Sequence, residues 1–198
     1  MTYINDGVQK TTYLCPEFKT KEDMSTVKWS LDTAHSELNF KVKHLMISNV
    51  KGSFKDFSVE ILGEDFATSK VNAQVKTTSI FTNNEDRDNH LRSADFFDVE
   101  NFSEMKFEGT SLTKKSSDEF TLVGNLTIKD VTKEVALAVD FGGVSKDPWG
   151  NEKLGFSVKG KINRKDFGLN WNAALETGGV LVSDEVRIEG ELQFAKQN

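Results

Sequence analysis

The stretch Glu185-Val-Arg-Ile-Glu-Gly-Glu-Leu-Gln-Phe194 decides the fold class, because apolar and polar residues alternate through it without a break. The same alternation runs through Lys153-Leu-Gly-Phe-Ser-Val-Lys-Gly-Lys-Ile162. A period of two is typical of a β-strand with one buried face and one solvated face. Both stretches are therefore predicted to be strands whose apolar faces cover a common core.

Six further runs show this alternation, which gives about eight strands separated by short polar turns. The six runs span residues 38–46, 53–61, 71–77, 105–109, 120–128 and 135–141. The apolar parity changes between Phe54 and Phe57, so a bulge or sharp bend is predicted near Lys55-Asp56. Gly142-Gly143 and Asp147-Pro-Trp-Gly150 carry the residue types of turns and are predicted to separate strands.

Two features favour a closed barrel over a sandwich. Inward-facing glycines recur at positions 109, 124, 160 and 190, where a barrel needs tight bends. The last strand is long and has no proline and no inward charge, so both of its edges are expected to be paired. The predicted fold is all-β: an extended, eight-stranded antiparallel barrel over residues 29–198, preceded by a polar N-terminal extension, residues 1–28. Such a barrel can be filled by side chains or can hold one elongated ligand.

A charged segment, residues 83–97, interrupts the strands. Asn83 or Asn84 can cap a short helix near residues 84–94, and acidic residues occupy its first turn, where the helix dipole favours them. The segment ends in Phe96 and Phe97, which are expected to point into apolar surroundings. Because its arginines and carboxylates lie so close together, a salt-bridged cap over the barrel is the favoured interpretation. A site for an anionic head group is the alternative.

Composition argues against several classes of function. The net charge of −6 disfavours general affinity for nucleic acid or anionic membranes, and the single cysteine, Cys15, permits no intrachain disulfide. The first 28 residues are polar and lack the apolar stretch of a secretory signal, and no segment approaches the length of a transmembrane helix. The chain as written is expected to be cytoplasmic, or periplasmic if its natural start lies upstream.

The sequence offers little support for catalysis or metal binding. The histidines, His35, His44 and His90, have none of the spacings of a zinc site, so no metal is expected. No Gly-x-Ser-x-Gly elbow or glycine-rich phosphate loop is present, so no catalytic residue is assigned. Two alternatives remain open by fold analogy. One is a barrel isomerase or hydrolase that uses His44, His90 or Asp88 as acid or base on a hydrophobic small molecule, and the other is a structural protein with a filled barrel.

Several motifs follow one another in order along the chain. They are Trp29-Ser-Leu-Asp-Thr-Ala-His-Ser36, Phe40-Lys-Val-Lys-His-Leu-Met46, Val50-Lys-Gly-Ser-Phe54, Arg87-Asp-Asn-His-Leu-Arg92, Asp95-Phe-Phe97, Gly124-Asn-Leu-Thr-Ile128, Asn163-Arg-Lys-Asp-Phe-Gly168, Trp171 and Val182-Ser-Asp-Glu-Val186. This ordered set resembles the YceI-like family of lipocalin-like, polyisoprenoid-binding barrels. The resemblance implies a helix near the barrel mouth and an apolar tunnel for a long lipid tail, such as that of a polyprenyl phosphate, a polyprenyl pyrophosphate or an isoprenoid quinone. It also implies a homodimer, and it leaves fatty-acid-like or amide ligands as an alternative. Many members carry a secretory signal, where this chain has the polar extension.

The expected ligand is therefore a bound isoprenoid lipid, for transport, storage or sequestration, with no other cofactor, no nucleic acid partner and no membrane span. The chain has 15 phenylalanines and only 2 tyrosines, and each buried CH₂ of a tail contributes about 0.8 kcal/mol. The predicted tail-binding residues lie mostly on inward faces: Leu38, Phe40, Val42, His44, Met46, Phe54, Val75, Phe97, Phe107, Leu126, Val139, Phe156, Ile162, Phe167 and Trp171. The predicted polar cap or head-group residues are His35, Arg87, Asp88, His90, Arg164 and Asp166. Arg164 and Asp166 are expected to pair at the end of the tunnel opposite the charged segment.

Overall fold

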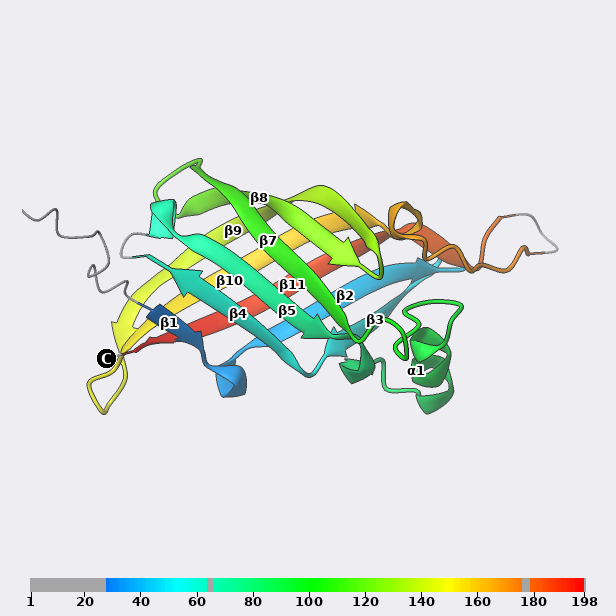
Figure 1. Ribbon diagram of the computed structural model, residues 1–198, viewed down its shortest axis with the longest axis horizontal. Helices are drawn as coiled ribbons and strands as arrows, with labels where there is room; N and C mark the ends of the chain where they lie inside the picture. The colour runs from blue at the N-terminus through cyan, green and yellow to red at the C-terminus, as the bar shows by residue number, and fades with distance from the viewer. Residues whose placement is uncertain (1–27, 64–65, 176–178, 198) are drawn as a thin grey trace, which may run out of the picture.

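The structure is a computed structural model that describes residues 28–63, 66–175 and 179–197 (Figure 1). Its strands are β1 (Lys28–Leu31), β2 (Glu37–His44), β3 (Ser48–Phe54), β4 (Phe57–Leu62), β5 (Lys70–Lys76), β6 (Ile80–Phe81), β7 (Glu104–Lys114), β8 (Glu119–Ile128), β9 (Val131–Lys146), β10 (Glu152–Asn163) and β11 (Val182–Lys196). Its helices are η1 (Thr33–His35), η2 (Phe66–Thr68), η3 (Thr77–Ser79), α1 (Glu85–Arg92) and η4 (Arg164–Phe167). The predicted extension lies outside the described residues, apart from Lys28, which opens β1.

The strands close into an antiparallel barrel. Hydrogen-bonded neighbours follow the order β1-β4-β5-β7-β8-β9-β10-β11, and β11 pairs back with β1. The C-terminal part of β11 pairs with β1, and its earlier residues pair with β2, so one long strand serves two short ones. The pairs β1 and β2, β3 and β4, and β5 and β6 are thus halves of three bent strands, which gives the predicted total of eight. The predicted all-β barrel is confirmed.

The structure confirms one predicted interruption of the strands and contradicts another. The break predicted at Lys55-Asp56 is present, since β3 ends at Phe54 and β4 begins at Phe57. The predicted turn at Gly142-Gly143 is wrong, because both glycines lie within β9. There the register against β10 shifts, and Gly143 has φ 106°, so the glycines form a bulge that bends the strand without ending it.

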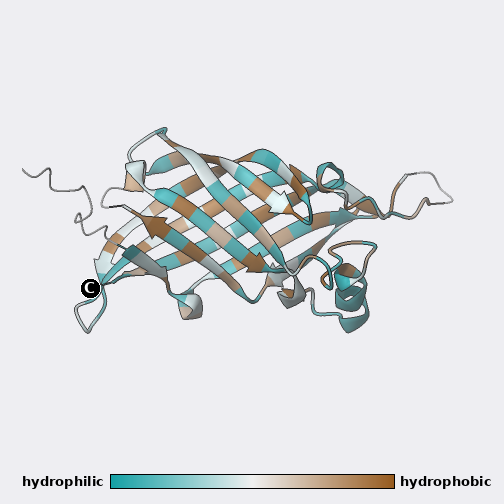
Figure 2. Cartoon of the chain, in the orientation of Figure 1, coloured by the Kyte–Doolittle hydropathy of each residue, from teal (hydrophilic) through white to brown (hydrophobic). Residues whose placement is uncertain are grey.

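Hydropathy alternates along the barrel wall as the sequence pattern requires, and α1 is strongly polar (Figure 2). None of the helices in the described ranges is long and apolar enough to cross a membrane. Pairs of oppositely charged side chains lie on the outer surface of the barrel. One of these pairs lies at the end where β1 and β11 meet and is partly shielded from solvent. Lys153 Nζ donates to Asp32 Oδ2 at 2.9 Å, and this bond lowers the pKa of Asp32 to about 2.

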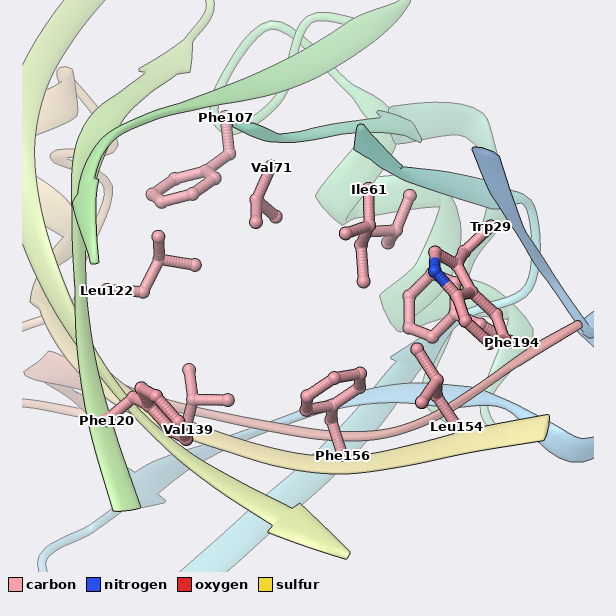
Figure 3. Close-up of a cluster of buried hydrophobic side chains, with 11 residues drawn as sticks. Trp29, Ile61, Val71, Phe107, Phe120, Leu122, Val139, Leu154, Phe156 and Phe194 are labelled. Atoms are coloured by element: carbon pink, nitrogen blue, oxygen red, sulfur yellow. The ribbon is translucent and has the colours of Figure 1, made fainter. Parts of the chain in front are cut away.

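Aromatic side chains fill the end of the barrel where β1 and the C-terminal part of β11 meet. Trp29, Phe156 and Phe194 point inward there together with neighbouring aliphatic residues (Figure 3). The ring of Phe66, from η2, packs against this cluster, with its centroid 4.4 Å from that of Phe156 and 5.3 Å from that of Phe120. This end of the barrel is therefore closed by packed rings.

A second apolar cluster lies at the α1 end. It includes Phe54, Ile80, Phe96, Phe97 and Met105, and it joins the segment after α1 to the barrel wall. Phe96 and Phe97 are both buried, as predicted. The charged segment is thus attached to the barrel by its two phenylalanines.

Gly124 tests how tightly the wall is packed. A Cβ at this inward position would lie 2.4 Å from Phe107 Cζ and 2.6 Å from the Glu108 carbonyl oxygen. We expect Gly124→Ala to lower the free energy of unfolding by about 1–3 kcal/mol, because a backbone atom as well as a ring must move. Urea denaturation measures this change.

The matched control is Gly155→Ala in β10, where a Cβ would meet no atom within 4 Å. Its effect should stay within about 0.5 kcal/mol. Equal losses in the two variants would contradict the packing described for Gly124.

Candidate functional site

A cavity of about 560 Å³ occupies the barrel interior between the two apolar clusters. Its size falls within the range usual for ligand pockets, and its wall is almost entirely apolar. Some lining residues, among them Val71, Leu122 and Leu137, belong to or pack against the aromatic cluster. The cavity therefore rules out the alternative of a completely filled barrel.

Most residues predicted to contact a tail line this cavity. They are Leu38, Phe40, Val42, His44, Phe54, Val75, Phe97, Phe107, Leu126, Ile162 and Trp171. Val139, Phe156 and Phe167 are buried but belong to the packed clusters and do not line the cavity. Parity alone cannot separate these two kinds of inward residue, because both point away from solvent.

Met46 is wrongly predicted to line the cavity. Strand β2 ends at His44, and Met46 lies in the following turn with φ 60° and 56% of its surface exposed. The alternating pattern extends beyond the point where the chain reverses. Sequence reasoning also missed Ile80, Leu169 and Leu181, which reach the cavity from a two-residue strand or from loops that have no period.

Polar side chains gather at one rim of the cavity. Asp86, Arg87 and His90 come from α1, and Arg164 comes from η4. Asn84 starts α1, since its side-chain oxygen accepts the Arg87 amide at 2.9 Å. The predicted helix is present, but it ends at Arg92. Ser93 follows it with an extended backbone, and its amide donates to the Asn89 and His90 carbonyls. The rim therefore lies at the α1 end, away from the packed aromatic cluster.

The predicted salt-bridged cap is replaced by hydrogen bonds around Thr82. Arg87 donates from Nε to the Thr82 hydroxyl and from Nη2 to the Thr82 carbonyl, each at 2.7 Å. Asp88 is buried and accepts the Thr82 amide at 2.9 Å and the Thr82 hydroxyl at 2.5 Å. Thr82 thus stands between one guanidinium and one carboxylate of the segment in which salt bridges were expected. Asp88 does not line the cavity.

Arg92 also forms hydrogen bonds to main-chain carbonyls where a salt bridge was expected. Its guanidinium donates to the Thr78 carbonyl at 3.0 Å and to the Ile80 carbonyl at 2.9 Å. Strand β6 pairs only with β3 in the described sheet, so carbonyls on its other side need donors, and the arginines supply them. Within residues 83–97, the contact found between a basic and an acidic side chain is the hydrogen bond between His90 Nε2 and Asp95 Oδ2 at 3.0 Å.

His90 also forms the aromatic part of the rim. Its ring packs edge-on against Trp171, with centroids 4.7 Å apart, and against Phe96 at 5.1 Å. Trp171 belongs to the loop that follows η4, so α1 and this loop meet at the rim. The contact places Arg164 at the same end as α1.

Arg164 was expected to pair with Asp166 at the opposite end, and both parts of this prediction are wrong. Its buried guanidinium donates to the carbonyls of Ser183 at 3.0 Å and Trp171 at 2.8 Å. Its nearest carboxylate is Asp184, at 3.5 Å, whereas Asp166 is exposed. Burial lowers the pKa of Arg164, and Asp184 opposes that shift. Arg164 therefore holds the loop after η4 against the start of β11.

The last predicted polar residue, His35, lies far along the barrel from α1. It belongs to η1, is largely exposed, and its Nδ1 lies 3.2 Å from Asp32 Oδ1. It locks a turn at the closed end and does not reach the cavity. Across the described ranges, no group of three or more His, Cys, Asp or Glu side chains is arranged to hold a metal ion.

A closed antiparallel barrel with an apolar cavity and a helix at its rim defines a lipocalin-like barrel. The chain belongs to the YceI-like family, since the sequence model of the YceI-like domain matches residues 29–194. A UPF0312 protein of Staphylococcus aureus strain N315 is 46% identical over 170 residues, which covers 84% of this chain and 96% of that protein. The resemblance drawn from the ordered motifs is thereby confirmed.

Solved structures show the same architecture. The YCEI protein of Campylobacter jejuni is 37% identical, has a TM-score of 0.68, and the match covers 85% of this chain and 97% of the other. A polyisoprenoid binding domain from Saccharophagus degradans has a TM-score of 0.65 at 17% identity, with 85% of this chain and 98% of that chain covered. At such low identity this second likeness shows the fold alone.

Thr82→Val tests the hydrogen bonds that hold α1 at the rim. The variant keeps the side-chain shape but deprives buried Asp88 of a donor and Arg87 of an acceptor. We expect the free energy of unfolding to fall by about 1–3 kcal/mol, and hydrogen exchange in α1 to accelerate. Thr78→Val is the matched control. Thr78 is exposed, and it binds Arg92 through its main-chain carbonyl, which the substitution leaves in place. If both variants behave alike, Thr82 does not have this role.

Proposed function

We propose that the protein binds an isoprenoid lipid, with the apolar tail inside the cavity and the head group at the α1 rim. The observation that carries the proposal is the cavity of about 560 Å³, whose wall is apolar from its aromatic end to the rim. Membership of the YceI-like family supports it, as does the shared fold with a domain described as polyisoprenoid binding.

The cavity volume suggests how much of a tail can be buried. If a methylene group takes about 30 Å³, as a water molecule does in the liquid, the cavity has room for on the order of 20 carbon atoms. At about 0.8 kcal/mol for each CH₂, the gross gain is on the order of 16 kcal/mol, before the entropy of association is subtracted. A tail of about this length can bind without a charged anchor, and a longer one would leave through the rim.

The rim is suited to a head group of low charge. Arg87 uses Nε and Nη2 on Thr82, and no described residue accepts from its Nη1, which is available to a ligand oxygen. Asp86 lines the same rim, and His90 is already paired with Asp95. Lys106 also lines the cavity, so the cations available to a head group are Arg87 and Lys106, with Asp86 close by. This modest positive charge favours a quinone or a monophosphate over a pyrophosphate, which requires more.

We propose binding for storage, transport or sequestration in preference to catalysis. Of the acid or base candidates, Asp88 lies behind Thr82 and away from the cavity. His90 is engaged by Asp95, and its ring is packed between Phe96 and Trp171. His44 lines the cavity, but within the described residues no hydrogen bond holds its ring, whereas a catalytic base is usually oriented by a further group.

Ala73→Phe tests the proposal by filling the cavity. Ala73 lines it from the inward face of β5, so a ring there would occupy space needed by a tail. We expect binding of geranylgeraniol and of a short-chain isoprenoid quinone to weaken at least tenfold. Gentle purification, organic extraction and mass spectrometry should find long-chain lipid in the wild-type protein and much less in the variant.

The matched control is Gln74→Phe, which adds the same ring to the exposed face of the same strand. It should bind both lipids like the wild-type protein. The proposal is wrong if repeated wild-type preparations contain no long-chain lipid and labelled polyprenols and quinones fail to bind.

A further inference from the structure

The turn between β2 and β3 exposes three consecutive apolar side chains. Leu45, Met46 and Ile47 have 37%, 56% and 84% of their surfaces exposed. Val180 is also 37% exposed. It directly precedes Leu181, whose carbonyl accepts the Leu45 amide at 2.8 Å. These four residues, here called the apolar tip, bring together two segments that are far apart in the chain.

The backbone of this turn is unfavourable for the side chains it carries. Leu45 has φ 52° and Met46 has φ 60°, and the Ile47 amide donates to the His44 carbonyl at 3.2 Å. Positive φ at both central residues of a tight hairpin turn favours Asn-Gly or Asp-Gly, because a Cβ is strained there. Leu and Met are exposed at these positions and gain little from packing. Local strain without a compensating packing gain points to a function for the side chains.

The apolar tip adjoins the cavity rim. His44, which precedes the turn, lines the cavity and pairs with Val182 of β11. Leu181 and Val182, which follow Val180, line it as well. The other strongly exposed apolar side chains of the described chain are separate from this surface: Val144 and Trp149 flank the β9–β10 turn at the closed end, and Phe81 lies beneath Lys55.

We propose that the apolar tip inserts into the surface of a lipid bilayer, so that the cavity rim faces the membrane from which a lipid tail is taken. The inference rests on the proposed lipid-binding function, because a long tail is collected from a membrane rather than from water. Exposed apolar side chains that gather at one place are typical of such a contact. Binding grows with the apolar area inserted into the interface.

The charges around the rim indicate that insertion is apolar rather than electrostatic. Glu85 and Asp86 are exposed in the first turn of α1 at the same end, whereas Arg87 and Arg92 of that helix donate to backbone carbonyls. The chain as a whole carries a net charge of −6. An acidic surface is repelled by anionic lipid. Docking should therefore occur on vesicles of pure phosphatidylcholine and persist in high salt.

The double substitution Leu45→Asn with Met46→Gly removes two of the four apolar side chains of the tip, leaves Ile47 and Val180 in place, and supplies the residues that the turn geometry favours. We expect its partition coefficient on phosphatidylcholine vesicles, measured by flotation, to fall about tenfold. Its thermal midpoint should equal or exceed that of the wild-type protein, so that weaker binding does not reflect unfolding. Trp149→Ser is the matched control, since it removes an exposed apolar side chain at the opposite end and should leave the partition coefficient unchanged.

Two readouts separate this inference from the proposed function. Geranylgeraniol supplied in solution should bind the double variant as tightly as the wild-type protein, whereas its transfer from vesicles should slow about tenfold. An unchanged vesicle affinity in the double variant overturns docking through the apolar tip, and so does a loss of affinity in Trp149→Ser alone. Failure of the wild-type protein to bind geranylgeraniol in solution contradicts the proposed function instead, whatever the vesicles show.

Discussion

The hydrogen bonding of β11 to both β1 and β2 is the constraint on which the rest of the structure depends. Its last residues pair with β1 and close the barrel, and its earlier residues pair with β2 and extend the wall toward α1. Closure leaves no free edge on the strands of the ring and directs every inward side chain into one enclosed space. The cavity exists because those side chains fill only part of that space.

The division between filled and open parts follows from the size and position of side chains. Trp29, Phe120, Phe156 and Phe194 meet at one end, where Phe66 packs against them. Farther along, valines, leucines and Ala73 line the wall and leave the centre empty. The cavity is therefore blind at the aromatic end, and polar side chains mark its rim at the other. An elongated apolar molecule with one polar end matches this arrangement.

Alternation along the chain was sufficient to predict the longer strands, since the period of two depends only on neighbouring residues, but it did not reveal the short strands β1 and β6. The parity change between Phe54 and Phe57 even located the break between β3 and β4. Contacts across the fold were not predictable in the same way. The arginines of the charged segment bind carbonyls near β6, and Arg164 meets Asp184, because the fold brings those groups together and sequence spacing does not reveal it. Met46 shows the same limit, since a strand pattern does not mark where the chain turns.

The central claim is that a lipid lies in the cavity with its head at the α1 rim and its tail toward the aromatic end. Paramagnetic relaxation from a nitroxide attached to the head of a bound prenyl lipid measures this orientation directly. The account predicts strong broadening of the amide signals of His90 and Trp171 and an unaffected Trp29 indole signal, because these groups lie at opposite ends of the barrel. Strong broadening of Trp29 with sharp rim signals, or no broadening of any interior residue, would contradict it.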